Sequence, residues 1–139
     1  MRRPLRATRK ERTVAPNELV SVVDDDESIR DSLPDLLRSF GFDACSFSSA
    51  EEFLHSDSLE RTDCLILDVA MPGVSGPELH RELIRRNMHI PTIFITAHSR
   101  RTLEREVLGR GAVACLPKPF SEVAIIDAVR TALAANENN

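Results

Sequence analysis

Three short segments that are almost wholly apolar limit most strongly how this chain can fold. They have the sequences VSVV, CLIL and TIFI and lie at Val20–Val23, Cys64–Leu67 and Thr92–Ile95. A strand with one face in water alternates between apolar and polar residues, whereas a strand covered on both faces is apolar throughout. We therefore expect these segments to be central strands of a parallel sheet.

A further apolar run at Ala112–Leu116 and a weaker one at Phe42–Phe47 bring the expected strands to five. The stretches between and after the strands carry apolar residues at helical spacing and predict five helices. The residues expected to face inward are Ile29, Leu33, Leu36, Leu37 and Phe40 in the first helix, Leu79, Leu83 and Ile84 in the third, Leu103, Val107 and Leu108 in the fourth, and Val123, Ile126, Val129 and Leu133 in the fifth. Strands that alternate with helices imply right-handed crossovers and a doubly wound α/β sandwich.

Local signals place several helix ends. The first helix is expected from about Glu27 to Phe40, with Asp26 as its cap. Pro34 lies inside this helix and should bend it or remove an internal hydrogen bond. Ser48 followed by Glu51 is a capping-box pattern that predicts the start of the second helix.

The length and charge distribution predict one folded domain with polar ends. A chain of 139 residues is about one domain long. Residues 1–18 hold six basic side chains, although the whole chain has a formal net charge of −4. We expect a basic, disordered tail at 1–17, a domain at 18–135 and a frayed end at 136–139. The acidic remainder argues against direct binding of nucleic acid by the folded part.

The apolar runs and the cysteines indicate where the protein is located. No apolar run approaches the roughly 20 residues that span a bilayer, so no membrane segment is expected. The three cysteines, Cys45, Cys64 and Cys115, are widely spaced and form no CxxC pair. They are typical of reduced thiols in a cytoplasmic protein.

Polar residues follow the apolar runs at the points where the strands should end. Asp24, Asp25 and Asp26 follow the first strand, Asp68 the third, Thr96 the fourth and Lys118 the fifth. Ligands of doubly wound folds bind outside the carboxyl ends of the strands, where the strand order reverses. We therefore expect these side chains to converge in one crevice.

The chemistry of this crevice would suit phosphoryl transfer. Clustered carboxylates repel one another unless a cation joins them, and oxygen ligands with room for water suit Mg²⁺. The hydroxyl of Thr96 and the ammonium of Lys118 are donors for phosphoryl oxygens, and Asp68 is placed to be a nucleophile. The chain has 16 arginines and two lysines, which makes a lysine at a strand end informative.

The four motifs VVDDDESIR, LILDVAMPGVSG, FITA and LPKPF, in this order, closely resemble the receiver domains of two-component response regulators. The resemblance covers residues 18–135. Within the family, the sequence is most similar to the receivers of nitrogen-fixation or LuxR-type transcription regulators. It implies a flavodoxin-like, five-stranded parallel sheet of order 2-1-3-4-5 with five helices.

The resemblance also implies a role for each matching residue. Asp68 would be the phosphoacceptor, and Asp25 a direct Mg²⁺ ligand assisted by Asp24, with Asp68 and the backbone carbonyl of Ala70 completing the protein ligands. Thr96 would be the switch hydroxyl, and Lys118 the ion-pair partner of the phosphoryl group. The Lys118–Pro119 peptide bond is expected to be cis.

The sequence departs from the family pattern at one relevant position. Many receivers carry Tyr or Phe three residues before the lysine, and this chain has Cys115 there. Any output must then pass through the backbone and the fourth helix. His98, two residues after Thr96, stands where family members tune dephosphorylation, but it is equally consistent with an ordinary loop residue. His55, His80 and His89 are expected at the surface.

As a receiver, the chain would be a phosphoacceptor rather than a turnover enzyme. A sensor histidine kinase would be its partner, and phosphorylation would change the face made by the fourth helix, fifth strand and fifth helix. Homodimerisation through this face, and a downstream effector domain or protein, are further implications. The chain is consistent with a stand-alone receiver or with the front half of a transcription regulator.

Three other functions fit the sequence less well. A pseudo-receiver that only binds a partner is disfavoured because Asp24, Asp25, Asp68, Thr96 and Lys118 are all present. A phosphatase of the dehalogenase type requires a second Asp two residues after the nucleophile, where this chain has Ala70. A nucleotide-binding role lacks a GxGxxG or Walker sequence.

Overall fold

A computed structural model describes residues 17–98 and 100–137, with side chains described as far as Ala135. The predicted basic tail lies outside the described residues except for Asn17, and so do the last two residues of the predicted C-terminal end. The division of the chain into tail, domain and end therefore stays a prediction.

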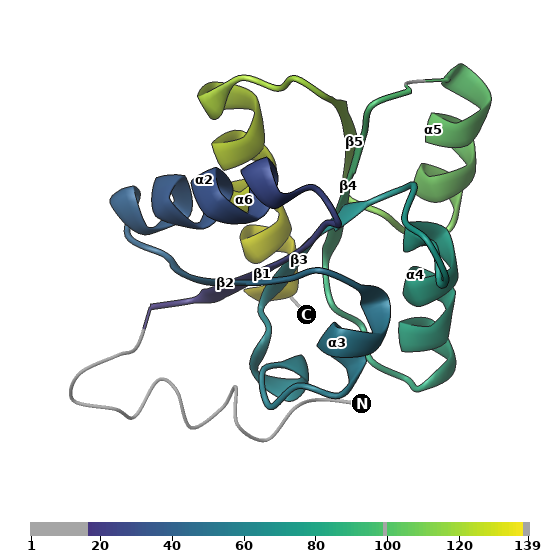
Figure 1. Cartoon of the computed structure of the whole chain (residues 1–139), viewed down its shortest axis with the longest axis horizontal. Helices are drawn as coiled ribbons and strands as arrows, with labels where there is room; N and C mark the ends of the chain where they lie inside the picture. Colours follow the sequence, from purple (N-terminus) through teal and green to yellow (C-terminus); the bar gives the residue numbers. More distant parts are fainter. Residues whose placement is uncertain (1–16, 99, 138–139) are drawn as a thin grey trace.

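Five parallel strands form one sheet in the order β2-β1-β3-β4-β5 (Figure 1). The strands are β1 (Leu19–Val23), β2 (Asp43–Phe47), β3 (Cys64–Asp68), β4 (Thr92–Thr96) and β5 (Ala114–Pro117). The predicted fold class and strand order are thus confirmed. The fifth strand starts later than predicted because the N–H of Ala112 bonds to the carbonyl of Val107 and closes the preceding helix.

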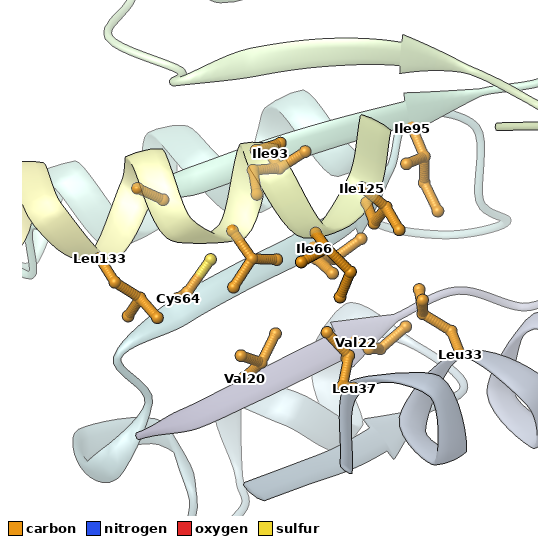
Figure 2. Close-up of a cluster of buried hydrophobic side chains, with 14 residues drawn as sticks. Val20, Val22, Leu33, Leu37, Cys64, Ile66, Ile93, Ile95, Ile125 and Leu133 are labelled. Atoms are coloured by element: carbon orange, nitrogen blue, oxygen red, sulfur yellow. The ribbon is translucent and has the colours of Figure 1, made fainter. Parts of the chain in front are cut away.

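Helices cover both faces of the sheet. They are α2 (Glu27–Ser39), α3 (Ala50–Leu54), α4 (Gly76–Arg85), α5 (Arg101–Gly109) and α6 (Glu122–Glu137), with a short 3₁₀ turn, η1, at Leu59–Arg61. Figure 1 shows α2 and α6 on one face and α3, α4 and α5 on the other. Each face has its own apolar cluster, and Figure 2 shows the one in which Val22, Ile66 and Ile93 meet α2 and α6.

Side-chain caps begin the helices close to where the sequence predicts. The carboxylate of Asp26 accepts a hydrogen bond from the N–H of Ser28 at 2.9 Å, so its predicted capping role is confirmed. The predicted start of α3 is wrong by one residue, because Ser49 rather than Ser48 caps it, by accepting from the N–H of Glu52. α2 continues through the buried Pro34, which has no N–H to donate to the helix.

Four apolar residues predicted to face inward are exposed, namely Phe40, Ile84, Leu108 and Val123. Ile84 and Leu108 directly follow buried residues of their helices, and adjacent helical residues point about 100° apart, so both cannot face the sheet. Phe40 lies just beyond α2, where the guanidinium of Arg130 is 5.8 Å from its ring centre. Val123 is in the first turn of α6, ahead of that helix's buried residues.

The three cysteines of the chain do not pair with one another. Cys64 is buried and Cys45 and Cys115 are half-buried, and all three are free thiols. In the part of the chain that the structure describes, every helix is too short or too polar to cross a bilayer.

Truncation of a central strand residue tests this arrangement. Ile66 is fully buried in β3, so Ile66→Ala should lower the free energy of unfolding by about 2–5 kcal/mol through lost burial and a cavity. Ile84→Ala, at a side chain that is 42% exposed, should change it by less than about 1 kcal/mol. Urea unfolding measures both, and equal losses would contradict the assignment of Ile84 to the surface.

Candidate functional site

The predicted polar residues meet at the carboxyl edge of the sheet. Asp24 directly follows β1, Asp68 ends β3, Thr96 ends β4 and Lys118 follows β5. β1 lies between β2 and β3, and this is where the strand order reverses. The site is therefore at the topological switch point, where ligands of such sheets bind.

Three carboxylates form the centre of the site. Asp24, Asp25 and Asp68 each offer an oxygen, and these atoms lie within 4.8 Å of one another. Asp24 is fully buried, Asp68 is nearly so, and Asp25 is exposed. Asp26 is exposed and is occupied as the cap of α2. The cluster thus combines two buried carboxylates, Asp24 and Asp68, with one solvent-exposed carboxylate, Asp25.

Lys118 supplies the positive charge of the site. Its Nζ lies 2.8 Å from Asp24 Oδ2 and 3.6 Å from Asp68 Oδ1. Its backbone N–H donates to the carbonyl of Thr96 at 2.8 Å, and the Lys118–Pro119 peptide bond is cis, as predicted. The closer ion pair is therefore with Asp24, which the sequence did not indicate.

One ammonium does not balance the buried negative charge. Burial, followed by the charge of Asp24, raises the pKa of Asp68 from its ordinary value of 3.8 to about 7, although Lys118 opposes this shift. Burial by itself lowers the pKa of Lys118, but the hydrogen bond and charge of Asp24 and the charge of Asp68 leave it above its ordinary value. The site therefore favours either a proton on Asp68 or an additional cation.

The two oxygens of Asp24 differ in their surroundings. Oδ1 accepts a hydrogen bond from the N–H of Asp26 at 2.9 Å. Oδ2 is buried and forms an ion pair with the Lys118 ammonium at 2.8 Å. Three carboxylates that share one ammonium fit a hard divalent cation with oxygen ligands, such as Mg²⁺.

Arg30 is a neighbour of the site that the sequence analysis missed. Its Nη1 donates to the backbone carbonyl of Asp24 at 3.0 Å and so holds the end of β1 against α2. The only sequence signal was its place one turn into the helix that follows the aspartates.

The loop after Asp68 is held close to β3. The N–H of Gly76 donates to the carbonyl of Val69 at 3.0 Å, and a Cβ at Gly76 would lie 2.2 Å from the carbonyl oxygen of Asp68. Gly73 has a positive φ of 76° in the same loop. Ala70 is exposed there, and its role as a carbonyl ligand stays a prediction.

Thr96 lies at the adjoining strand end. It is 4% exposed, and its Oγ1 accepts a hydrogen bond from the N–H of His98 at 3.1 Å. β4 pairs with β3 so that Asp68 is opposite Ile95, which puts Thr96 one residue further along the edge. The hydroxyl therefore fastens the start of the loop between β4 and α5.

A sequence model of one family, the response regulator receiver domain, matches residues 20–130. The chain belongs to this family. It is 46% identical over 111 residues to nodulation protein W of Bradyrhizobium diazoefficiens, covering 80% of this chain and 49% of that protein. It is 42% identical over 114 residues to the transcriptional regulatory protein FixJ of Azorhizobium caulinodans, covering 82% and 54%. The chain thus spans about half the length of these relatives.

Solved structures of receivers have the same fold. A structure of the response regulator StyR matches with a TM-score of 0.81 and 43% identity, over 88% of this chain and 62% of that one. A FixJ-N crystal structure matches with a TM-score of 0.77 and 37% identity, over 85% and 94%. The acidic trio of this receiver domain is consistent with the metal site typical of its family.

Neutralising Asp68 should stabilise the metal-free protein at neutral pH. Because the folded-state pKa of Asp68 is raised, the stability that its protonation provides is fully present below about pH 4 and is lost as the pH rises to about 7. In EDTA, Asp68→Asn should therefore raise the free energy of unfolding by roughly 1–3 kcal/mol at pH 8 and by much less at pH 4.5. Urea unfolding at both pH values checks this.

The exposed Asp127 of α6 provides the matched control. Asp127→Asn should leave the free energy of unfolding nearly unchanged at both pH values. A loss of stability in Asp68→Asn at pH 8 would contradict the charge imbalance described for the pocket.

Proposed function

We propose that this receiver domain is a phosphorylation-dependent switch of a two-component system, with Asp68 as phosphoacceptor and a sensor histidine kinase as its phosphoryl donor. The observation that supports this most directly is the imbalance of two buried carboxylates against one ammonium, with a third carboxylate open to solvent. Such a site favours the binding of a cation together with a phosphoryl group, whose oxygens can also contact that cation.

Asp68 is the carboxylate suited to be the nucleophile. One of its oxygens lies within 4.8 Å of an oxygen of each of the other two carboxylates, and it is partly neutralised by the Lys118 ammonium at 3.6 Å. In the transfer, a carboxylate oxygen of Asp68 bonds to phosphorus, the P–N bond to the kinase histidine breaks, and the imidazole nitrogen keeps the electron pair. The products are an acyl phosphate on Asp68 and an imidazole that regains a proton from water.

Asp24, Asp25, Asp68 and the carbonyl of Ala70 are the groups that would hold Mg²⁺ in this pocket. When bound, Mg²⁺ would supply positive charge against the phosphoryl oxygens. Lys118 would turn from Asp24 toward the phosphoryl group, and Arg30 would keep the end of β1 in place. The contribution of these residues is positioning and charge neutralisation rather than proton transfer.

Thr96 is proposed as the residue that reports phosphorylation. Its Oγ1 accepts a hydrogen bond from the N–H of His98. A rotation of the side chain that carries the hydroxyl to a phosphoryl oxygen would break this bond. The released loop leads into α5, and Leu103 of that helix and Cys115 of β5 both pack against the same apolar cluster. With a thiol in place of an aromatic ring, the change would reach the α5–β5–α6 face through the backbone and α5.

The remaining parts of the proposal concern the whole protein. Relatives that this chain matches over about half their length are transcriptional regulators by name, so an effector domain or protein downstream fits the same chemistry. A receiver that meets a kinase domain in this way would work in the cytoplasm. A partner-binding pseudo-receiver stays the alternative, and phosphorylation distinguishes the two.

Intact-protein mass spectrometry tests the phosphoacceptor. With acetyl phosphate and Mg²⁺, the wild-type chain should gain the mass of one phosphoryl group, because acetyl phosphate is an acyl phosphate donor to the carboxylate of Asp68. Asp68→Asn and an EDTA sample should gain none, whereas Asp127→Asn should behave as wild type. Wild-type protein that gains no mass would favour the pseudo-receiver, and gain in Asp68→Asn would place the acceptor elsewhere.

Substitution of the hydroxyl tests the switch separately. Thr96→Ala should still accept the phosphoryl group, but the amide NMR shifts that phosphorylation causes in α5 and β5 should be at least about halved, because no hydroxyl leaves His98. Thr96→Ser keeps the hydroxyl and should retain them. Full shifts in Thr96→Ala would show that another group reports the phosphoryl state.

A further inference from the structure

A small cavity lies at the edge of the sheet opposite the acidic pocket. Its volume is about 250 Å³, and its walls come from the end of α4, the segments that lead into β4 and β5, and the end of α6. The residues that matter for its chemistry are His80, Ile84, Met88, His89, Arg110 and Val113. It shares no residue with the acidic site.

The charge of the cavity is opposite to that of the chain. His80, His89 and Arg110 bring nitrogen donors, the other lining residues are apolar or glycine, and no carboxylate is among the described residues that line it. The chain as a whole has 22 acidic and 18 basic side chains. A hollow in which only cationic or neutral groups meet is therefore suited to an anion.

His80 is the buried polar group of this cavity. It was predicted at the surface, but it is only 6% exposed, because its ring packs edge-on against Phe94 at 5.5 Å between ring centres. None of its ring nitrogens is hydrogen-bonded to any of the described residues. Burial, with the charge of Arg110, lowers its pKa, so the ring is neutral and keeps one N–H to donate. Because His80 lines the cavity, this N–H is available to a ligand there.

Arg110 has donors to spare. Within the described part of the chain, its side chain makes one long contact, from Nη2 to Glu106 Oε2 at 3.5 Å, in an exposed i,i+4 pair. Such pairs contribute little, and a guanidinium has several further N–H groups in a planar fork that matches a carboxylate.

We propose that this cavity binds a small organic monocarboxylate, with the carboxylate on Arg110 and His80 and the apolar body against Ile84, Met88 and Val113. The volume corresponds to about eight waters at roughly 30 Å³ each, which is space for a body of about ten non-hydrogen atoms. A ligand of that size binds with a Kd on the order of 1 mM. The site is additional to the phosphoacceptor and does not depend on that proposal.

An NMR titration of the unphosphorylated chain with three probes tests the site. Sodium benzoate has the charge and the apolar body, benzamide has the same shape without the charge, and sulfate has the charge without the body. Benzoate should give saturable amide shifts confined to residues 79–94, 107–114 and 131–137, with a Kd on the order of 1 mM. Benzamide and sulfate should bind at least about fivefold more weakly.

Three outcomes would overturn the proposal. Equal binding of benzamide would remove the role of charge, and equal binding of sulfate would remove the role of the apolar body. Benzoate shifts that do not saturate, or that fall outside these segments, would mean that the cavity does not take the probe.

Matched variants locate the contacts. Arg110→Gln should weaken benzoate binding at least about fivefold, whereas Arg105→Gln, in the preceding helix α5 and outside the cavity, should not change it. Ala135→Leu narrows the cavity without changing any charge and should also weaken binding, with an unchanged Tm showing that the fold is intact. Equal losses in Arg105→Gln and Arg110→Gln would indicate non-specific attraction and would contradict the site.

Discussion

The sharing of one ammonium between two buried carboxylates is the constraint on which the rest of this structure depends. Lys118 contacts Asp24 closely and Asp68 more distantly, and Asp24 is fully buried whereas Asp68 is 5% exposed. Burial and the charge of Asp24 raise the pKa of Asp68 to about 7. The two carboxylates therefore repel each other unless Asp68 is protonated or a cation binds. A bound cation would relieve this repulsion and favour the ionised form of Asp68.

The apolar strands and helices around the site stabilise the fold and so offset the cost of burying these charges. β1, β3 and β4 are buried on both faces, and two apolar clusters hold them against the helices. Parallel strands bring their carboxyl ends to one edge, so residues far apart in sequence meet without long loops. The close approach of Gly76 to the Asp68 carbonyl fixes where the third strand ends.

Much of this could be predicted because strand burial and strand ends are local patterns. The runs that are apolar throughout located the sheet, and the polar residues after them located the site. The errors lie where a residue's fate depends on its neighbours in space. Ile84 and Leu108 directly follow buried residues but are exposed, whereas His80 is buried because its ring packs against Phe94. The closeness of Lys118 to Asp24 depends on sheet order and has no signal in sequence.

Calorimetric titration of Mg²⁺ into the apo protein, in buffers of different ionisation enthalpy, tests the charge imbalance most directly. A cation that relieves the repulsion must displace the proton of Asp68, so binding should release protons at about pH 6 and none at about pH 8.5. Asp68→Asn should release none at either pH. Saturable binding with the same proton release in wild type and Asp68→Asn, or no saturable binding by the wild type, would contradict the account.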